Sequence, residues 1–335
     1  MHLGRRIAFI HHSRNSESSL EIGIGVETAA EALGCELLSF DPDFDQERRR
    51  QCVGEAIASG PDLIVAAVVA PQLLPDLFAE VAERGIPWIE VGARQQWAPG
   101  LTAQVVPDES ALTALLDRWM IAALGIRLGT DAPAEIAAWI APALGEGLLA
   151  RDRQRARDLA AHPNLSEVET HEIDLGNLVE DIRTSTVAAL ERHPGLQALW
   201  QTCEPCVATQ AQALDRLGLS GEQRPLIGGF YSNRATRRLL AERRVDGLVQ
   251  VDTRVQGLAA VDLAVQHWTI GAPWPGADDD PLAAYGEPLG QPWMITAANV
   301  GDDPDLLVPP GPDPVTFFQR QWQSQLGTLD TTKEF

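Results

Sequence analysis

Short apolar runs alternate with longer segments of helical periodicity along this sequence, and no other feature constrains the fold as strongly. The pattern is clearest between residues 193 and 261, where the runs LQALW, PLIGGF and DGLVQV flank segments with apolar residues at helical spacing. Strands that alternate with helices of this length form βαβ units, because each helix returns the chain to the same edge of a sheet. The sequence therefore predicts an α/β fold with parallel sheets.

The same alternation fills the first third of the chain and starts again near Glu135. The run DLIVAAVV is apolar throughout, as expected for a central parallel strand covered on both faces. Because 335 residues exceed what one core usually holds, we expect two doubly wound lobes. Strands are predicted at 6–10, 35–40, 62–69, 87–91 and 103–106, and then at 135–140, 168–173, 197–200, 226–230 and 247–251.

Charge and hydropathy exclude several classes of partner. The formal net charge of −21 argues against nucleic acid, whose phosphates would be repelled. No stretch approaches the roughly 18 apolar residues of a membrane span. The opening MHLGRR leads into the run IAFI, which is too short for the apolar region of a secretory signal. If the protein is exported, we expect this sequence to be its trimmed form.

Several motifs, taken in order, resemble the type I periplasmic solute-binding proteins, the ribose- and galactose-binding kind. In that family one strand ends in Asn-Asp before a helix, the next ends in Gly-Phe-Asp, and a third carries Gln before a Gly-containing helix. The corresponding residues here are Cys203-Glu204, Gly229-Phe230-Tyr231, and Gln250 with Gly257. The later segment PWMITAANV resembles the ending of the sugar-binding branch, with Thr296, Asn299 and Val300 in register. The resemblance extends over about residues 5–300.

This resemblance implies two Rossmann-like lobes joined by a three-crossing hinge, with a ligand cleft between them. We expect residues 1–106 and 253–291 in the first lobe, and 107–252 with 292–335 in the second. The crossings would lie near 105–108, 251–254 and 291–296. The tail after residue 300 is expected either to pack as an extension or to be disordered in part beyond Gly327.

The resemblance also implies a function. The protein would be the substrate-binding component of an ABC uptake transporter, located outside the cytoplasmic membrane. It would close around a small polar ligand, most plausibly a sugar, a modified sugar or a polyol, and deliver it to a membrane permease. We expect a monomer that uses no cofactor and no metal and catalyses no reaction.

Candidate ligand residues in the first lobe follow its first and fourth strands. In the loop HHSRNSESS, the family's polar position falls on Asn15 or Ser16, and its aromatic pair is replaced by Ser18 and Ser19. These two serines would either contact the ligand or cap the helix that follows. Two more candidates lie in the loop VGARQQW. Arg94 would pair with an anionic ligand group or remain solvated, and Trp97 would stack on the ligand or pack at the hinge.

Candidate residues in the second lobe come from the three motifs above. We expect Tyr231 and Gln250 beside the ligand, whereas Glu204 is either a ligand contact or a charge that stabilises a helix N-terminus.

Other functions remain as alternatives. A regulatory or chemoreceptor sensor shares this fold, although the acidity is wrong for DNA binding. Cys203 and Cys206 form a Cys-x-x-Cys motif at a predicted helix start, the layout of thiol oxidoreductases, and would also be able to form a local disulfide. A zinc site would need two further ligands, and no second Cys/His pair has a usual spacing.

Overall fold

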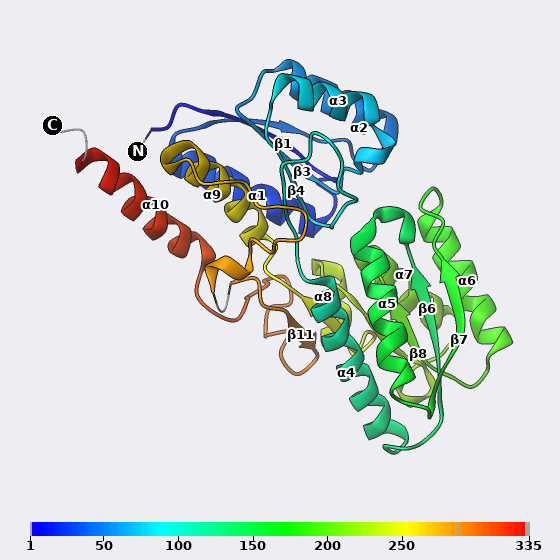
Figure 1. Ribbon diagram of the computed structural model, residues 1–335. Helices are drawn as coiled ribbons and strands as arrows, with labels where there is room; N and C mark the ends of the chain where they lie inside the picture. The colour runs from blue at the N-terminus through cyan, green and yellow to red at the C-terminus, as the bar shows by residue number, and fades with distance from the viewer. Residues whose placement is uncertain (1, 287–288, 332–335) are drawn as a thin grey trace. The chain divides into compact units, whose positions relative to one another are not determined.

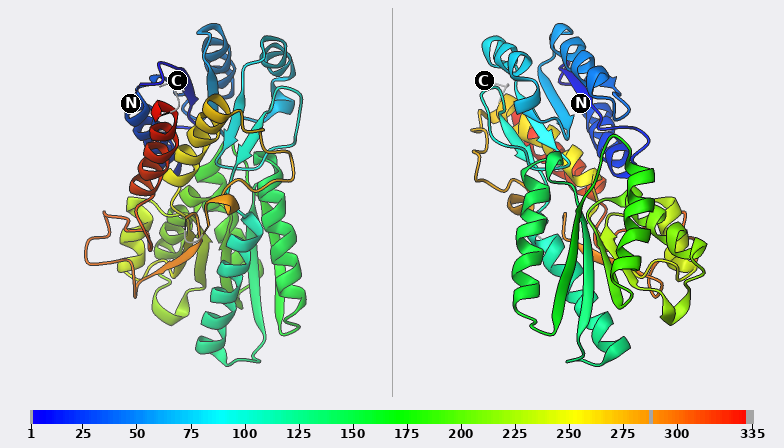
Figure 2. Two further views of the ribbon diagram at one scale, coloured as in Figure 1. Left: turned by 60° about the vertical axis from the view of Figure 1, so that its left-hand side comes forward. Right: turned by 90° about the vertical axis from the view of Figure 1, so that its right-hand side faces the viewer.

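The computed structural model describes residues 2–286 and 289–331, with side chains described to residue 325. The described chain divides into two compact units. Unit 1 contains residues 1–107, 252–291 and 310–335, and unit 2 contains residues 108–251 and 292–309. The family resemblance is confirmed at the level of fold, since each unit is built on a mainly parallel sheet with helices on its faces (Figures 1 and 2).

Unit 1 is a five-stranded parallel sheet in the order β2-β1-β3-β4-β5. Its strands are β1 (Arg6–Ile10), β2 (Glu36–Phe40), β3 (Leu63–Ala67), β4 (Trp88–Val91) and β5 (Ala103–Val105). Its helices are α1 (Glu17–Leu33), α2 (Gln46–Ala58), α3 (Pro75–Arg84), α9 (Arg254–Ile270) and α10 (Pro314–Thr331). The central strand β3 is fully buried, as its apolar sequence predicts.

Helices α1 and α9 cover one face of this sheet, and α2 and α3 cover the other (Figure 1). The contact between α1 and α9 depends on two glycines. A Cβ atom on Gly257 would lie 2.2 Å from the carbonyl oxygen of Ile22, and one on Gly25 would lie 2.3 Å from that of Arg254. Any larger residue would therefore force the two helices apart.

Unit 2 is a six-stranded sheet in the order β11-β10-β9-β8-β6-β7, parallel except where β11 pairs antiparallel with β10. Its strands are β6 (Ala134–Ile140), β7 (Leu165–Glu172), β8 (Leu196–Gln201), β9 (Leu226–Phe230), β10 (Gly247–Gln250) and β11 (Trp293–Thr296). Its helices are α4 (Glu109–Leu128), α5 (Glu146–Ala160), α6 (Leu178–Arg192), α7 (Glu204–Arg216) and α8 (Arg234–Ala241). Single 3-10 turns lie at Pro71–Leu73, Pro142–Leu144, Gly221–Gln223 and Ala283–Tyr285 of the chain.

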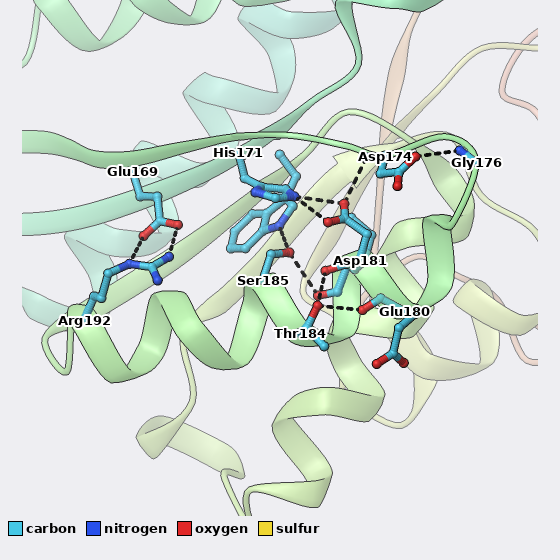
Figure 3. Close-up of polar contacts among 11 residues, drawn as sticks. Glu169, His171, Asp174, Gly176, Glu180, Asp181, Thr184, Ser185 and Arg192 are labelled. Atoms are coloured by element: carbon cyan, nitrogen blue, oxygen red, sulfur yellow. Dashed lines mark hydrogen bonds and ion pairs between the residues drawn. The ribbon is translucent and has the colours of Figure 1, made fainter.

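The edge strand β7 is held to α6 by polar contacts as well as by packing. Figure 3 shows the carboxylate of Asp181 accepting from the ring of His171, at 2.9 and 3.0 Å, and Glu169 paired with Arg192. The hydroxyl of Ser185 accepts from the buried indole of Trp139 on the neighbouring strand β6, at 2.8 Å. These contacts fix an edge strand whose own residues are mostly not buried.

The C-terminal tail differs from the expectation that placed residues 292–335 in the second lobe. Residues 292–309 do belong to unit 2, but residues 310–335 are grouped with unit 1, so the chain passes between the units a fourth time. The physical reason is a buried carboxylate on α9. Asp262 accepts hydrogen bonds from the indole of Trp322 at 2.7 Å, from the hydroxyl of Tyr285 at 2.8 Å, and from two glutamine side chains. Residues 332–335 lie outside the described residues, and α10 continues past Gly327 to Thr331.

The third crossing was expected near residues 291–296, and the division into units falls between residues 291 and 292. Residues 293–296 form β11, a strand that was not predicted and that completes the sheet of unit 2. Among the residues described, no helix is both long and apolar enough to cross a membrane.

Candidate functional site

In parallel sheets of this type, ligand sites lie beyond the carboxyl ends of the strands, where the strand order reverses. The reversal falls between β1 and β3 in unit 1 and between β6 and β8 in unit 2. The residues that directly follow these strands and their neighbours are therefore the candidates in each unit.

The loop after β1 is organised around Ser19. This hydroxyl is buried and accepts from the backbone N–H groups of His12 at 3.1 Å and Ser13 at 3.4 Å. The expectation that Ser18 or Ser19 caps the helix is wrong, because the N-cap position is Ser16, which makes no side-chain capping bond. The hydroxyls of Ser16 and Ser18 lie 3.0 Å apart.

Asn15 completes this loop by donating from its amide to the carboxylate of Asp43, at 2.7 Å. The four predicted residues of this loop are thus brought together, and each has a partner within the loop or in the segment that follows β2.

Two further sets of polar contacts lie near the same edge of unit 1. The ring of His12 contacts the guanidinium of Arg49 at 3.1 Å, and the carboxyl of Glu90 at the end of β4 accepts from the indole of Trp88 and from the backbone of Val69. Burial, and then the charge of Arg49, lowers the pKa of His12 to about 3. Burial raises the pKa of Glu90 well above its usual value. His12 is therefore neutral at physiological pH and acts as a fixed part of the scaffold.

The loop after β4 holds Arg94 and Trp97. The guanidinium of Arg94 donates to the backbone carbonyl of Ala277 at 3.0 Å, so it is not fully solvated. The indole of Trp97 is 38% exposed.

The strand-end edge of unit 2 contains a buried ion pair that the sequence analysis missed. Nε of Arg151, on α5, donates to the carboxylate of Glu109 at 2.6 Å, and both side chains are almost fully buried. Another guanidinium nitrogen donates to the carbonyl of Thr202, at the end of β8, at 2.5 Å. The guanidinium also lies over the rings of Phe230 and Tyr231, 3.9 and 5.3 Å from their centroids.

Two buried polar atoms of this cluster make no hydrogen bond of ordinary geometry with the described residues. They are Oε1 of Glu109 and the hydroxyl of Tyr231, and these two groups lie close enough to interact with each other and with Arg151. Burial raises the pKa of Glu109 although Arg151 opposes that shift. Burial, followed by the charge of Glu109, raises the pKa of Tyr231, so its hydroxyl keeps its proton. A carboxylate oxygen and a phenol hydroxyl are thus left without a hydrogen bond of good geometry, which buried polar groups normally have.

The sequence did contain a pattern that indicates buried arginines in α5. Leu148, Arg151, Arg155 and Leu159 follow at helical spacing, so two arginines interrupt the inward stripe of α5. Glu109 and Asp117 are eight positions apart on the buried face of α4. Charged residues at buried helical positions predict pairing, although which acid meets which arginine depends on how the helices pack.

The three residues expected in the second lobe all lie at the strand-end edge of unit 2. Both ends of the Gln250 amide bond to the backbone, because its oxygen accepts from the N–H of Ser232 at 2.7 Å and its nitrogen donates to the carbonyl of Val251 at 3.0 Å. Gln250 therefore fixes the loop after β9. Glu204 is buried as the first residue of α7, where a carboxylate is stabilised by the helix dipole.

Strained backbone marks both strand-end edges. Val68, directly after β3, has φ of 57°, and Tyr231, directly after β9, has φ of 61°. Residues other than glycine rarely adopt this left-handed backbone conformation, and a β-branched residue such as Val68 is a true outlier there. Such strain concentrates at functional sites. In the described ranges, no three His, Cys, Asp or Glu side chains are grouped so as to hold a metal ion.

Comparison with known proteins shows which family the sequence belongs to. Residues 7–272 match the model of the periplasmic binding protein domain. No curated protein matches the sequence. Solved structures do match. A solute-binding protein of an ABC transporter from Agrobacterium vitis, bound to α-D-tagatopyranose, superposes with a TM-score of 0.74 at 19% identity, covering 89% of this chain and 96% of that one.

Two further structures give the same result. One is an ABC transporter solute-binding protein from Agrobacterium vitis with bound allitol (TM-score 0.72, 15% identity, 89% of this chain and 97% of that one). The other is a glucose-galactose binding protein from Geobacillus stearothermophilus (TM-score 0.71, 15% identity, 89% and 99%). At these identities the structures show a shared fold, and the family is shown by the match over most of the sequence. The chain belongs to the periplasmic binding protein domain family.

Proposed function

We propose that this protein is the extracytoplasmic solute-binding component of an ABC uptake transporter and that it captures a neutral polyhydroxylated compound, a sugar, modified sugar or polyol. Membership of the periplasmic binding protein domain family supports a binding role rather than an enzymatic one. The permease of the transporter would be its protein partner.

The observation that carries the ligand class is the cluster of Glu109, Arg151 and Tyr231 in unit 2. A sugar hydroxyl both donates and accepts, and it suits the two atoms of the cluster that lack a hydrogen bond of good geometry, a carboxylate oxygen and a phenol hydroxyl. The rings of Phe230 and Tyr231 supply apolar surface beside these atoms, as sugar sites require. The structural neighbours named above include complexes with a ketohexose and with a polyol.

Charge favours a neutral ligand over an acid. The guanidinium of Arg151 is already neutralised by Glu109 at 2.6 Å, and Arg94 is bonded to a backbone carbonyl. A carboxylate ligand would have to displace Glu109 and leave that carboxylate buried without a cation, which is strongly unfavourable.

A thermal-shift screen followed by calorimetry tests the proposal. The panel should hold aldoses, ketoses, polyols, carboxylates, amino acids and nucleosides. A ligand present at 100 times its Kd stabilises a fold by about 2.7 kcal/mol, which is a clear rise in Tm. We expect hits among the sugars or polyols only. Lobe closure, which the sequence resemblance implies, would appear as a smaller radius of gyration when the ligand is added.

Three variants connect a hit to this cluster. Tyr231→Phe removes one hydroxyl and should weaken binding by about three- to tenfold, the value of one net hydrogen bond. Glu109→Gln should also weaken it. Gln197→Ala is the matched control. The side chain of Gln197 accepts from the backbone N–H of Glu135 where β6 and β8 begin, at the ends of these strands that lie away from the cluster. Binding that is unchanged by both site variants, or hits confined to carboxylates, would refute the assignment.

A further inference from the structure

Cys203 and Cys206 occupy the first turn of α7, Cys203 as its N-cap residue and Cys206 inside the helix. The N–H of Cys206 donates to the carbonyl of Cys203 at 3.2 Å, which closes a turn between them. A turn of this kind holds its end Cα atoms within about 7 Å, and a disulfide requires about 4.4–6.8 Å. Both cysteines are free thiols in the structure, and their side chains share a hydrogen bond.

The surroundings of the two sulfur atoms differ. The hydrogen bond from the Cys206 thiol lowers the pKa of Cys203; burial opposes this shift, while the positive charge of Arg151 supports it. The same hydrogen bond, together with burial, raises the pKa of Cys206. Arg151 is held close by its bond to the carbonyl of Thr202, the residue before Cys203. The N-terminus of α7 adds positive potential at Cys203.

We propose that Cys203 and Cys206 form a thiol-exchange site, in which Cys203 is the attacking thiol and Cys206 resolves the mixed disulfide. The proposal does not rest on the function proposed above, although Arg151 is a neighbour of both the ligand cluster and Cys203. Cys203 is only half-buried and so can meet a small reagent, whereas Cys206 is buried and can be reached by Cys203.

The exchange balances with an external small-molecule disulfide as the oxidant. The Cys203 thiolate attacks one sulfur of that disulfide, its S–S bond breaks, and one thiolate leaves and takes up a proton. Cys206 then loses its proton and attacks the Cys203 sulfur, which expels the second thiolate. The two cysteines lose two electrons and two protons in total, and one disulfide is reduced to two thiols.

The remaining cysteines provide an internal comparison. Burial raises the pKa of both Cys35 and Cys52. Neither has a second cysteine nearby in sequence, so neither can close a short disulfide.

Trypsin separates the three regions, because the chain has arginines at suitable positions. The peptide 193–216 contains Cys203 and Cys206 and no other cysteine, while Cys35 lies in peptide 15–48 and Cys52 in peptide 51–84. The folded full-length protein is equilibrated in glutathione buffers of increasing oxidised fraction, quenched in acid, alkylated and digested. We expect peptide 193–216 to lose two hydrogen atoms, reversibly, while the other two peptides remain alkylated.

Single variants test the order of attack. In Cys206→Ser, glutathione should remain attached at position 203, because no resolving thiol is present. In Cys203→Ser, attachment at position 206 should be slower by about tenfold or more, because the Cys206 thiol is buried and burial by itself raises its pKa. Cys35→Ser is the matched control and should leave the behaviour of the pair unchanged. Circular dichroism checks that each variant is folded.

Two results would overturn the proposal. One is a peptide 193–216 that stays doubly alkylated across the whole range of buffers. The other is glutathione that accumulates on Cys203 of the unmodified protein without closure to the disulfide, which would show that Cys206 cannot resolve it.

Discussion

Replacement of Asp117 by Asn should remove a loss of stability that unit 2 undergoes as the pH rises. Asp117 is 3% exposed on α4, and its Oδ1 accepts from the indole of Trp200 at 2.9 Å. Burial raises its pKa to about 8, and the neighbouring Asp158 contributes to that shift. An aspartate in the unfolded chain titrates near 4. The folded state therefore binds a proton that the unfolded state releases, between about pH 4 and pH 8.

The sign follows from this difference. The carboxyl of Asp117 favours folding fully below about pH 4, and this contribution is lost as the pH rises through about 8. Asparagine keeps the acceptor for Trp200, places an N–H toward Asp158, and does not titrate. The stability of Asp117→Asn relative to the unmodified protein should rise by about 1.4 kcal/mol per pH unit, or about 4 kcal/mol from pH 5 to pH 8.

Urea unfolding at four pH values between 5 and 8, followed by circular dichroism, measures this difference. Where the two units unfold separately, two transitions should be fitted. The predicted stability difference then belongs to the transition of unit 2, which contains Asp117. The variant Asp131→Asn, at an exposed position, controls for the change of charge alone. A stability difference that stays constant with pH, or that shrinks as the pH rises, would refute the reasoning.

Three further changes have defined outcomes. Trp322→Phe should lower the free energy of unfolding by about 1–3 kcal/mol, because the buried Oδ1 of Asp262 loses its hydrogen bond; urea titration measures it, and a loss below about 0.5 kcal/mol would contradict the contact. Glu109→Ala should cost about 3–5 kcal/mol by leaving a buried guanidinium without its acid, with loss of the folded circular dichroism signal at a lower temperature as the readout. Gly257→Ala should destabilise by at least about 1–3 kcal/mol through the clash between α1 and α9, whereas Gly54→Ala, which meets no atom within 4 Å in α2, should stabilise by about 0.5–1 kcal/mol in the same melting experiment.

The sequence predicted most of the strands well because they are short apolar runs bounded by polar residues. The runs at residues 6–10 and 226–230 match β1 and β9 residue for residue. The expected strand at 168–173 is Leu165–Glu172 in the structure, since the edge strand β7 is mostly polar and its start carries little hydropathy signal. Strand β11 was not predicted, since its four residues are short for a strand and follow a long loop.

The candidate site was predicted only as a set of loops. Family motifs located Tyr231 and Glu204 at strand ends, but they gave no sign that the amide of Gln250 would be used by backbone groups. Arg151 was missed because it lies within a helix, away from the motif it serves, and its partner Glu109 is 42 positions earlier in the chain. The attachment of α10 was missed for the same reason, since the contact of Asp262 with Trp322 spans 60 positions.

The close crossing of α1 and α9 has a consequence for the order in which the molecule assembles. Ile22 and Gly257 are more than 200 residues apart in the sequence, and unit 2 is almost entirely encoded between them. Unit 2 therefore has nearly all of its strands before α9 has been synthesised, while the first sheet still lacks one of the two helices that cover the same face. Contacts between distant segments form late because the loop must close first. We expect refolding from urea to proceed through a species with unit 2 formed and apolar surface of unit 1 exposed, which makes dilute protein the favourable condition for recovery.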